Sequence, residues 1–195
     1  MRMQKFLLLA ILFFFVSDVC IAENRPGATT FTLAAAYYHF SSARNLKNAS
    51  LPNIALAYNF NERWAIEGGV GVINTNQRTT DQGVHGFLYT IDGLYRFKPH
   101  QHFEPYVLAG IGILGLKPNG NSNEHQGNIN AGIGAQFFAD KSIALRAELR
   151  DVYTMSGGKN DWMANIGVSY LFDGETPESP VVEKTSLKDE NPEAK

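Results

Sequence analysis

The stretch from Asp161 to Phe172, DWMANIGVSYLF, alternates apolar side chains with mostly small or polar ones. Successive side chains of an extended strand point to opposite faces, so one face of this strand would be apolar throughout. A water-soluble sandwich would turn that face inward, whereas a membrane barrel would turn it outward to lipid. The period predicts a strand and leaves both folds open. The apolar face comprises Trp162, Ala164, Ile166, Val168, Tyr170 and Phe172.

The preceding sequence consists of short alternating runs separated by polar, turn-rich segments, without a helical period of useful length. Counted with the last run, they predict eight strands, an even number that can close without a free edge. The predicted connections alternate between long polar ones and short turns, the usual asymmetry of membrane barrels. The strands are expected at 28–40, 53–60, 63–73, 87–97, 105–116, 128–138, 143–153 and 161–172. The long connections are expected at 41–50, 74–86, 117–127 and 154–160.

Aromatic residues fall at the ends of these strands, where a membrane barrel places its interfacial girdles. One girdle would contain Phe60, Trp64, Phe97, Tyr170 and Phe172, and the other Tyr38, Phe87, Tyr153 and Trp162.

The two ends of the chain differ from the middle. Residues 1–22 combine Arg2 and Lys5 with an apolar run and a small-x-small site ending at Ala22, which predicts a secretory signal peptide. Residues 23–27 would lead into a barrel domain over 28–172, and the acidic segment 173–195 is expected to be a disordered periplasmic tail. The only cysteine, Cys20, lies in the signal, so no disulfide is expected. A net charge of -2 shows no nucleic-acid footprint.

The last predicted strand also contains a pattern of four residues at fixed spacing. Asn165, Gly167, Tyr170 and the terminal Phe172 follow the spacing of a polar residue, a glycine, an aromatic residue and a final phenylalanine. This pattern resembles the insertion signal of bacterial outer-membrane barrels. With the run LRAELR at 145–150, residues 28–172 resemble the eight-stranded transmembrane domain of the OmpA family. The resemblance implies an all-β, antiparallel, up-and-down barrel in the outer membrane of a Gram-negative bacterium. The chain departs from the longer family members after Phe172, where only residues 173–195 follow, so the family's peptidoglycan-binding domain is not expected.

The expected inward face carries charges of both signs. The acids are Glu67, Asp92 and Glu148, and the bases are Arg96, Arg146 and Arg150. An unpaired buried charge costs several kcal/mol, so we expect a salt-bridge network that fills the narrow interior. Strand 63–73 would lie across the barrel from strand 143–153, and the OmpA resemblance implies charge pairing between them. We expect Glu67 to pair with Arg146, with Arg150 as the alternative.

Three other motifs each match part of a known functional site. Gly110-Ile-Gly-Ile-Leu-Gly115 matches a dinucleotide fingerprint, but Lys117-Pro118 follows where a helix should begin. His100 and His102 lack a third metal ligand, so neither a metal nor a cofactor is expected. The spacing of His39 and Ser41 resembles that of lipid A deacylases, and only Asp161 could supply the orienting acid.

These observations predict a non-enzymatic outer-membrane barrel with a structural or surface-interaction role and at most a narrow, low-conductance pore. The alternatives are an enzyme acting on lipid A and an adhesin or serum-resistance protein acting through its loops. The expected partners are outer-membrane lipid, lipopolysaccharide and the barrel-assembly machinery, with host or surface ligands at the loops. Both chain termini would lie in the periplasm.

Overall fold

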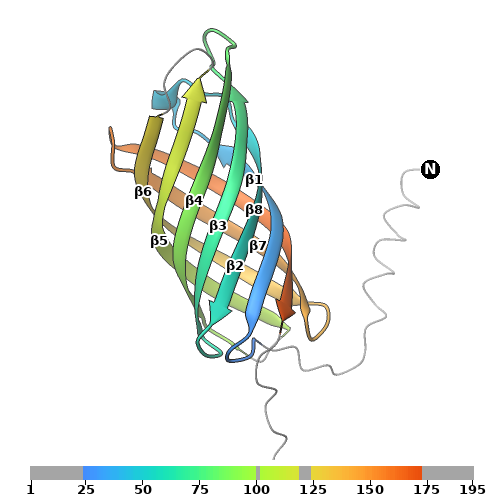
Figure 1. Cartoon of the computed structure of the whole chain (residues 1–195). Helices are drawn as coiled ribbons and strands as arrows, with labels where there is room; N and C mark the ends of the chain where they lie inside the picture. The colour runs from blue at the N-terminus through green and yellow to red at the C-terminus, as the bar shows by residue number, and fades with distance from the viewer. Residues whose placement is uncertain (1–23, 100–101, 119–123, 173–195) are drawn as a thin grey trace, which may run out of the picture.

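The computed structural model describes residues 24–99, 102–118 and 124–172. The predicted signal peptide and acidic tail, and His100, lie outside these residues. Eight strands form one closed barrel in which each strand pairs antiparallel with its neighbours along the chain, and β1 pairs with β8 (Figure 1). The predicted fold class is therefore confirmed. The strands are β1 (Thr29–His39), β2 (Ala49–Asn59), β3 (Trp64–Asn76), β4 (Gly83–Arg96), β5 (Phe103–Pro118), β6 (Glu124–Phe138), β7 (Ile143–Thr154) and β8 (Lys159–Phe172).

Several strands are longer than their sequence period predicts. The β3–β4 ladder continues through Asn74↔His85 to Asn76↔Gly83, inside the segment expected to be the longest loop. β5 and β6 likewise extend to Pro118 and from Glu124, into the segment expected to be a loop over 117–127. Ladder hydrogen bonds join backbone groups, so polar side chains do not end a strand that is already paired.

The barrel has two distinct ends. At the terminal end, β1 begins and β8 finishes, and the β2–β3, β4–β5 and β6–β7 connections lie there. At the opposite end, which we call the loop end, lie the β1–β2 connection with its short 3-10 helix η1 (Ser42–Arg44) and the β3–β4 and β7–β8 connections (Figure 1).

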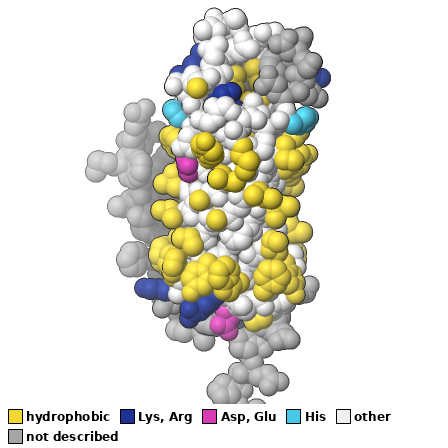
Figure 2. Space-filling view, turned by 90° about the vertical axis from the view of Figure 1, so that its left-hand side faces the viewer, with side chains coloured by type: hydrophobic (Ala, Val, Ile, Leu, Met, Phe, Trp, Pro, Cys, Tyr) yellow, Lys and Arg dark blue, Asp and Glu magenta, His cyan; other side chains and the backbone are white. Residues whose placement is uncertain are grey.

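The outer surface is a broad apolar band with charged side chains mainly beyond its edges (Figure 2). Side chains alternate between the two faces, as the predicted period of two requires: Phe31 and Leu33 of β1, for example, are exposed, whereas the intervening Thr32 is buried. Aromatic rings pair near the terminal end, with Trp64 and Tyr95 at 4.8 Å and Tyr170 and Phe172 at 4.6 Å between ring centroids. The girdle prediction is wrong for one residue, because Tyr38 is fully buried inside the barrel.

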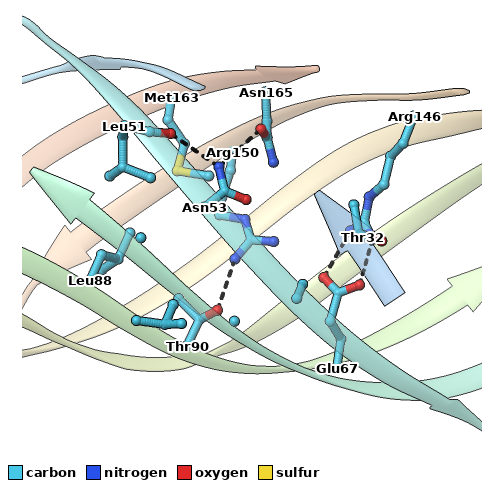
Figure 3. Close-up of a pocket in the computed structure, with 14 residues that line it drawn as sticks. Thr32, Leu51, Asn53, Glu67, Leu88, Thr90, Arg146, Arg150, Met163 and Asn165 are labelled. Carbon is cyan, nitrogen blue, oxygen red and sulfur yellow. Dashed lines mark hydrogen bonds and ion pairs between the residues drawn. The ribbon is translucent and has the colours of Figure 1, made fainter. Parts of the chain in front are cut away.

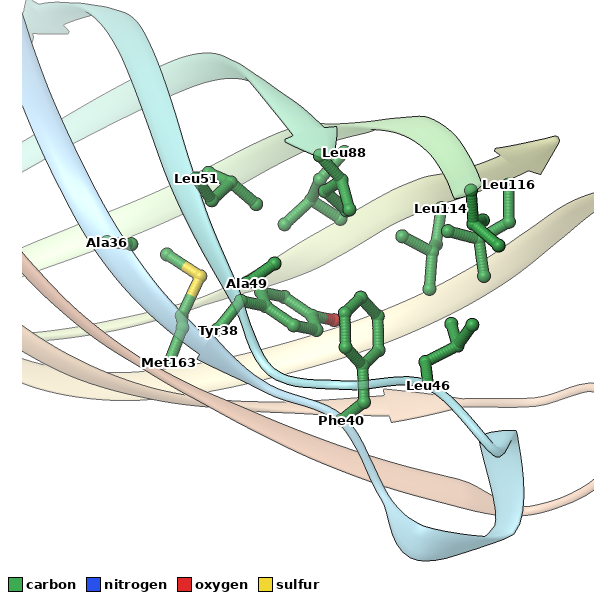
Figure 4. Packing of buried hydrophobic residues seen from close by; sticks show 12 residues of the cluster. Ala36, Tyr38, Phe40, Leu46, Ala49, Leu51, Leu88, Leu114, Leu116 and Met163 are labelled. Atoms are coloured by element: carbon green, nitrogen blue, oxygen red, sulfur yellow. The ribbon is translucent and has the colours of Figure 1, made fainter. Parts of the chain in front are cut away.

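An apolar cluster occupies part of the interior in the loop half of the barrel. Phe40 and Leu46 from the β1–β2 connection fold inward over side chains of the strands below (Figure 4). Their partners in this apolar cap include Tyr38, Leu51, Leu88, Leu114, Leu116 and Met163. Burial of these apolar side chains stabilises the closed loop half of the barrel.

Candidate functional site in the barrel lumen

The centre of the lumen is crossed by an ion pair between opposite walls. Arg146 of β7 donates from Nη1 and Nη2 to the two carboxylate oxygens of Glu67 on β3, the second at 2.9 Å (Figure 3). Nη2 also donates to Glu148 Oε2 at 2.6 Å. Both Glu67 and Arg146 are only 4% exposed at their side chains. This bidentate ion pair joins β3 and β7, which are separated by three strands in each direction around the closed sheet.

Arg150 extends the ion-pair network by one step toward the loop end. Its Nη1 lies 2.7 Å from Asp92 Oδ2, and its Nη2 lies 2.8 Å from Glu148 Oε1. Glu148 therefore bridges the two arginines, and the connected group holds three carboxylates and two guanidinium groups. Moving a charge out of water costs several kcal/mol, so buried charges are stable only when each one is paired and hydrogen-bonded.

Tyr106 of β5 belongs to the same network, although the sequence had not singled it out. Its hydroxyl donates to Glu148 Oε2 at 2.8 Å and accepts from Arg146 Nε at 2.7 Å. The Arg146 guanidinium also lies 5.1 Å from the centre of the Tyr106 ring. A buried tyrosine hydroxyl needs such partners, and only its inward parity in β5 could have suggested this position.

Arg96, the sixth predicted charge, lies apart from these ion pairs. It is 1% exposed, and its Nη2 donates to Asn59 Oδ1 at 3.0 Å. Asn59 in turn donates to Asn24, which precedes β1 and is fully buried at the terminal end. Asn24 Nδ2 also donates to Glu104 and, at 3.3 Å, to Gln136. Asn24, which belongs to the segment expected to be a simple lead into the barrel, thus contributes to the polar contacts inside the barrel at the terminal end.

A small cavity lies between the ion pairs and the apolar cap. It measures about 30 Å³, room for about two water molecules. Thr32, Asn53, Thr90 and Asn165 supply polar groups to its wall, together with the Glu67, Arg146 and Arg150 side chains (Figure 3). A void of this size holds water but no larger solute.

A second buried ion pair lies at the loop end. Arg44 of η1 reaches Asp161 of β8 with Nε at 2.8 and 3.0 Å from the two carboxylate oxygens. Arg44 also donates to Gln126 at 2.8 Å and to Thr154 at 2.5 Å. This contact fixes the β1–β2 connection over the lumen. The polar composition of that connection did not indicate that it folds inward.

The same contact bears on the histidine–serine motif. The predicted approach of Asp161 to Ser41 occurs, but Asp161 accepts from the Ser41 backbone N–H at 2.8 Å and is held by Arg44. His39 instead stacks on Trp162, with the ring centroids 5.1 Å apart, on the outer surface of the barrel. The structure therefore does not assemble a serine, histidine and aspartate relay.

The other sequence motifs also lie in the sheet or outside the described residues. Gly110 and Gly115 are in β5, with no helix following within residues 102–118. His102 immediately precedes β5, and no group of three or more histidine, cysteine or acidic residues that could hold a metal occurs in the described part of the chain. In the same residues no helix is long and apolar enough to cross a membrane.

The predicted assembly signal lies at the seam that closes the barrel. Phe172 is in register with Thr29 of β1, and Tyr170 is in register with Phe31. Asn165 Oδ1 accepts from Asn53 across the lumen wall at 3.3 Å. A side chain at Gly167 would come within 2.5 Å of the Ala34 Cβ, so only glycine allows this close approach of β8 to β1.

The geometry agrees with comparisons to known proteins. Residues 6–172 match the model of the outer membrane protein beta-barrel domain family. The chain belongs to this family. A curated relative, outer membrane porin F of Pseudomonas aeruginosa, is 27% identical over 148 residues, covering 70% of the chain and 42% of the relative. The chain thus spans less than half the length of that protein.

Solved structures share the fold. The N-terminal β-barrel domain of Pseudomonas aeruginosa OprF superposes with a TM-score of 0.59 at 21% identity, covering 76% of this chain and 100% of that one. Neisserial surface protein A gives a TM-score of 0.62 at 17% identity, covering 77% and 100%. Ail, the attachment invasion locus protein of Yersinia pestis, gives 0.55 at 17%, covering 75% and 99%. The protein is therefore an outer-membrane β-barrel, and the predicted likeness to the OmpA family is confirmed.

Proposed function

We propose that this protein is a closed structural barrel of the outer membrane that presents its loop end to the cell exterior, with both termini in the periplasm. The observation that carries the proposal is the Glu67–Arg146 ion pair, which spans the lumen from β3 to β7. The apolar cap above it and the Asn24 contacts below it support the same conclusion. Ions would have to displace buried, mutually paired charges to pass, so conductance is at most low.

We also propose that the protein has no enzymatic activity. Asp161 is engaged by Arg44, and His39 faces away from it. The partners we propose are outer-membrane lipid and lipopolysaccharide around the barrel, the assembly machinery that inserts it, and surface ligands at the loop end. None of these partners requires passage through the lumen.

Recordings in planar lipid bilayers test the closed lumen. The folded full-length protein should show at most rare, small openings, and a sustained open current would contradict the proposal. A variant with Glu67→Ala and Arg146→Ala should open more often, because it lacks the contact that spans the lumen. Lys141→Gln, which removes an exposed charge at the terminal turn, is the control and should behave as the wild type.

Cysteine labelling in intact cells tests the orientation. Ser156→Cys lies in the exposed β7–β8 connection at the loop end, and Lys141→Cys lies in the exposed β6–β7 turn at the terminal end. A membrane-impermeant maleimide should label the first variant in intact cells and the second only after the outer membrane is permeabilised. The reverse pattern would show that the barrel is inserted the other way round.

A further inference from the structure

Three basic side chains line one hollow on the outer surface of the barrel, away from the lumen. They come from adjacent strands near the loop end: His85 of β4, Lys117 of β5 and His125 of β6. His85 is in register with Lys117, and Gly115 is in register with His125. These side chains border a hollow of about 250 Å³, which we call the basic hollow. Its remaining lining residues are Gly86, Phe87, Gly115 and Leu116.

The shape of the basic hollow depends on a glycine and an aromatic ring. A side chain at Gly115 would come within 2.5 Å of the Phe87 ring, so this ring lies directly against the glycine backbone. The ring of His125 is 5.6 Å from that of Phe87 on the far side of Gly115. Phe87 therefore forms an apolar wall, and the two histidines and Lys117 border the space beside it.

The donors around the basic hollow suit an anion. His85 Nδ1 lies 2.7 Å from Asn74 Oδ1, and because an amide oxygen only accepts, Nδ1 carries a hydrogen. When that ring is protonated, Nε2 becomes a second donor. Lys117 and His125 are exposed, and none of the described residues lining the hollow is acidic. A lysine ammonium is a compact charge that binds phosphate well.

The position of the basic hollow along the barrel axis indicates which anion it binds. Toward the loop end, the outward side chains of β4 change from aromatic, at Tyr89 and Phe87, to basic, at His85. Those of β5 change from apolar, at Ile113, through Gly115 to basic, at Lys117. On β6 the outward side chain near the loop end is His125. Histidine side chains lie along the upper edge of the apolar band, with lysine and arginine side chains beyond it (Figure 2). This is the level at which lipid headgroups meet the barrel.

We propose that the basic hollow binds a phosphate group of lipopolysaccharide in the outer leaflet. Lys117 and the two histidines would contact the phosphate, while Phe87 would pack against the adjoining sugar or acyl chain. The inference rests on the proposed function, because the loop end must face the outer leaflet. It identifies where on the barrel the lipid partner is held and which part of that lipid is recognised.

Native mass spectrometry of the folded full-length protein tests the site. The protein is released from detergent micelles containing EDTA, which removes bridging divalent cations, and diphosphorylated lipid A is added. The wild type should retain lipid A, and Lys117→Gln should lower its apparent affinity about fivefold, the effect expected for one lost cation near a lipid surface. Replacing His85, Lys117 and His125 together with glutamine should abolish retention.

Lys159→Gln is the matched control, because it removes the same charge at the loop end from β8, outside the basic hollow. It should leave retention unchanged. A shift between unboiled and boiled samples on a detergent gel verifies that each variant is folded. The proposal is overturned if Lys159→Gln weakens retention as much as Lys117→Gln does, or if dephosphorylated lipid A is retained equally well.

Two further arms distinguish other sources of the anion. Equal retention of phosphatidylglycerol would show a general anionic surface, and complete displacement of lipid A by inorganic phosphate would show a site for free phosphate; either result overturns the proposal. Failure of the lipid site can be told apart from failure of the proposed function. If Ser156→Cys is labelled in intact cells but Lys117→Gln retains lipid A normally, the lipid site alone is wrong.

Discussion

The two partners of the central ion pair should differ in how much stability their removal costs. Glu67→Gln leaves Arg146 with two partners, Glu148 Oε2 at 2.6 Å and the Tyr106 hydroxyl at 2.7 Å. We therefore expect a loss of about 1.5–3 kcal/mol in the free energy of unfolding, the value of hydrogen bonds to a charged group. Arg146→Gln instead leaves Glu67 buried without its ion-pair partner and should cost about 3–5 kcal/mol.

Urea unfolding in lipid vesicles measures these losses, with the fluorescence of Trp64 and Trp162 reporting on the transition. The double variant should cost less than the sum of the single losses, by about 0.5–3 kcal/mol, because neither charge is then left alone. Lys141→Gln is exposed and should stay within about 0.5 kcal/mol of the wild type. The reasoning is refuted if Glu67→Gln costs as much as Arg146→Gln, or if the two losses simply add.

Three other perturbations test separate parts of the barrel. Arg44→Gln removes the cation paired with the buried Asp161, so protease should cut the β1–β2 connection faster, and unchanged cleavage would contradict its role. Phe172→Ala should slow assembly at the β1–β8 seam, seen as more unfolded chain in the periplasm, and an unchanged outer-membrane yield would argue against the signal. Hydrogen bonds from Lys47 and Asn76 hold the pKa of the exposed Asp81 below its ordinary value. Their stabilising contribution is therefore complete above about pH 4 and is lost as the pH falls through the lowered value. The protection factors of residues 77–82, which correct amide exchange for its own dependence on pH, should then fall in acid in the wild type, and Asp81→Asn should abolish this fall.

The sequence alone predicted the fold class because a period of two is a local property of the backbone. The alternation in β8 and β3 placed Ile166 and Ile66 on the outer face and Glu67 on the inner face, and the cost of an unpaired buried charge required a partner for Glu67. The even strand count and the alternating connection lengths indicated closure. These inferences needed no knowledge of which residues meet across the barrel.

The tertiary structure decided what the local period leaves open. Tyr37 and Tyr38 are adjacent aromatics at the end of β1, so the period of two puts them on opposite faces, and the closed barrel buries Tyr38 in register with Met163. The stagger of the closed sheet brings Arg146, rather than Arg150, to Glu67. Arg44 enters the lumen from a polar connection because Asp161 lies there to pair with it. The basic hollow likewise exists only because β4, β5 and β6 bring His85, Lys117 and His125 to neighbouring positions, which depends on how the three strands pair.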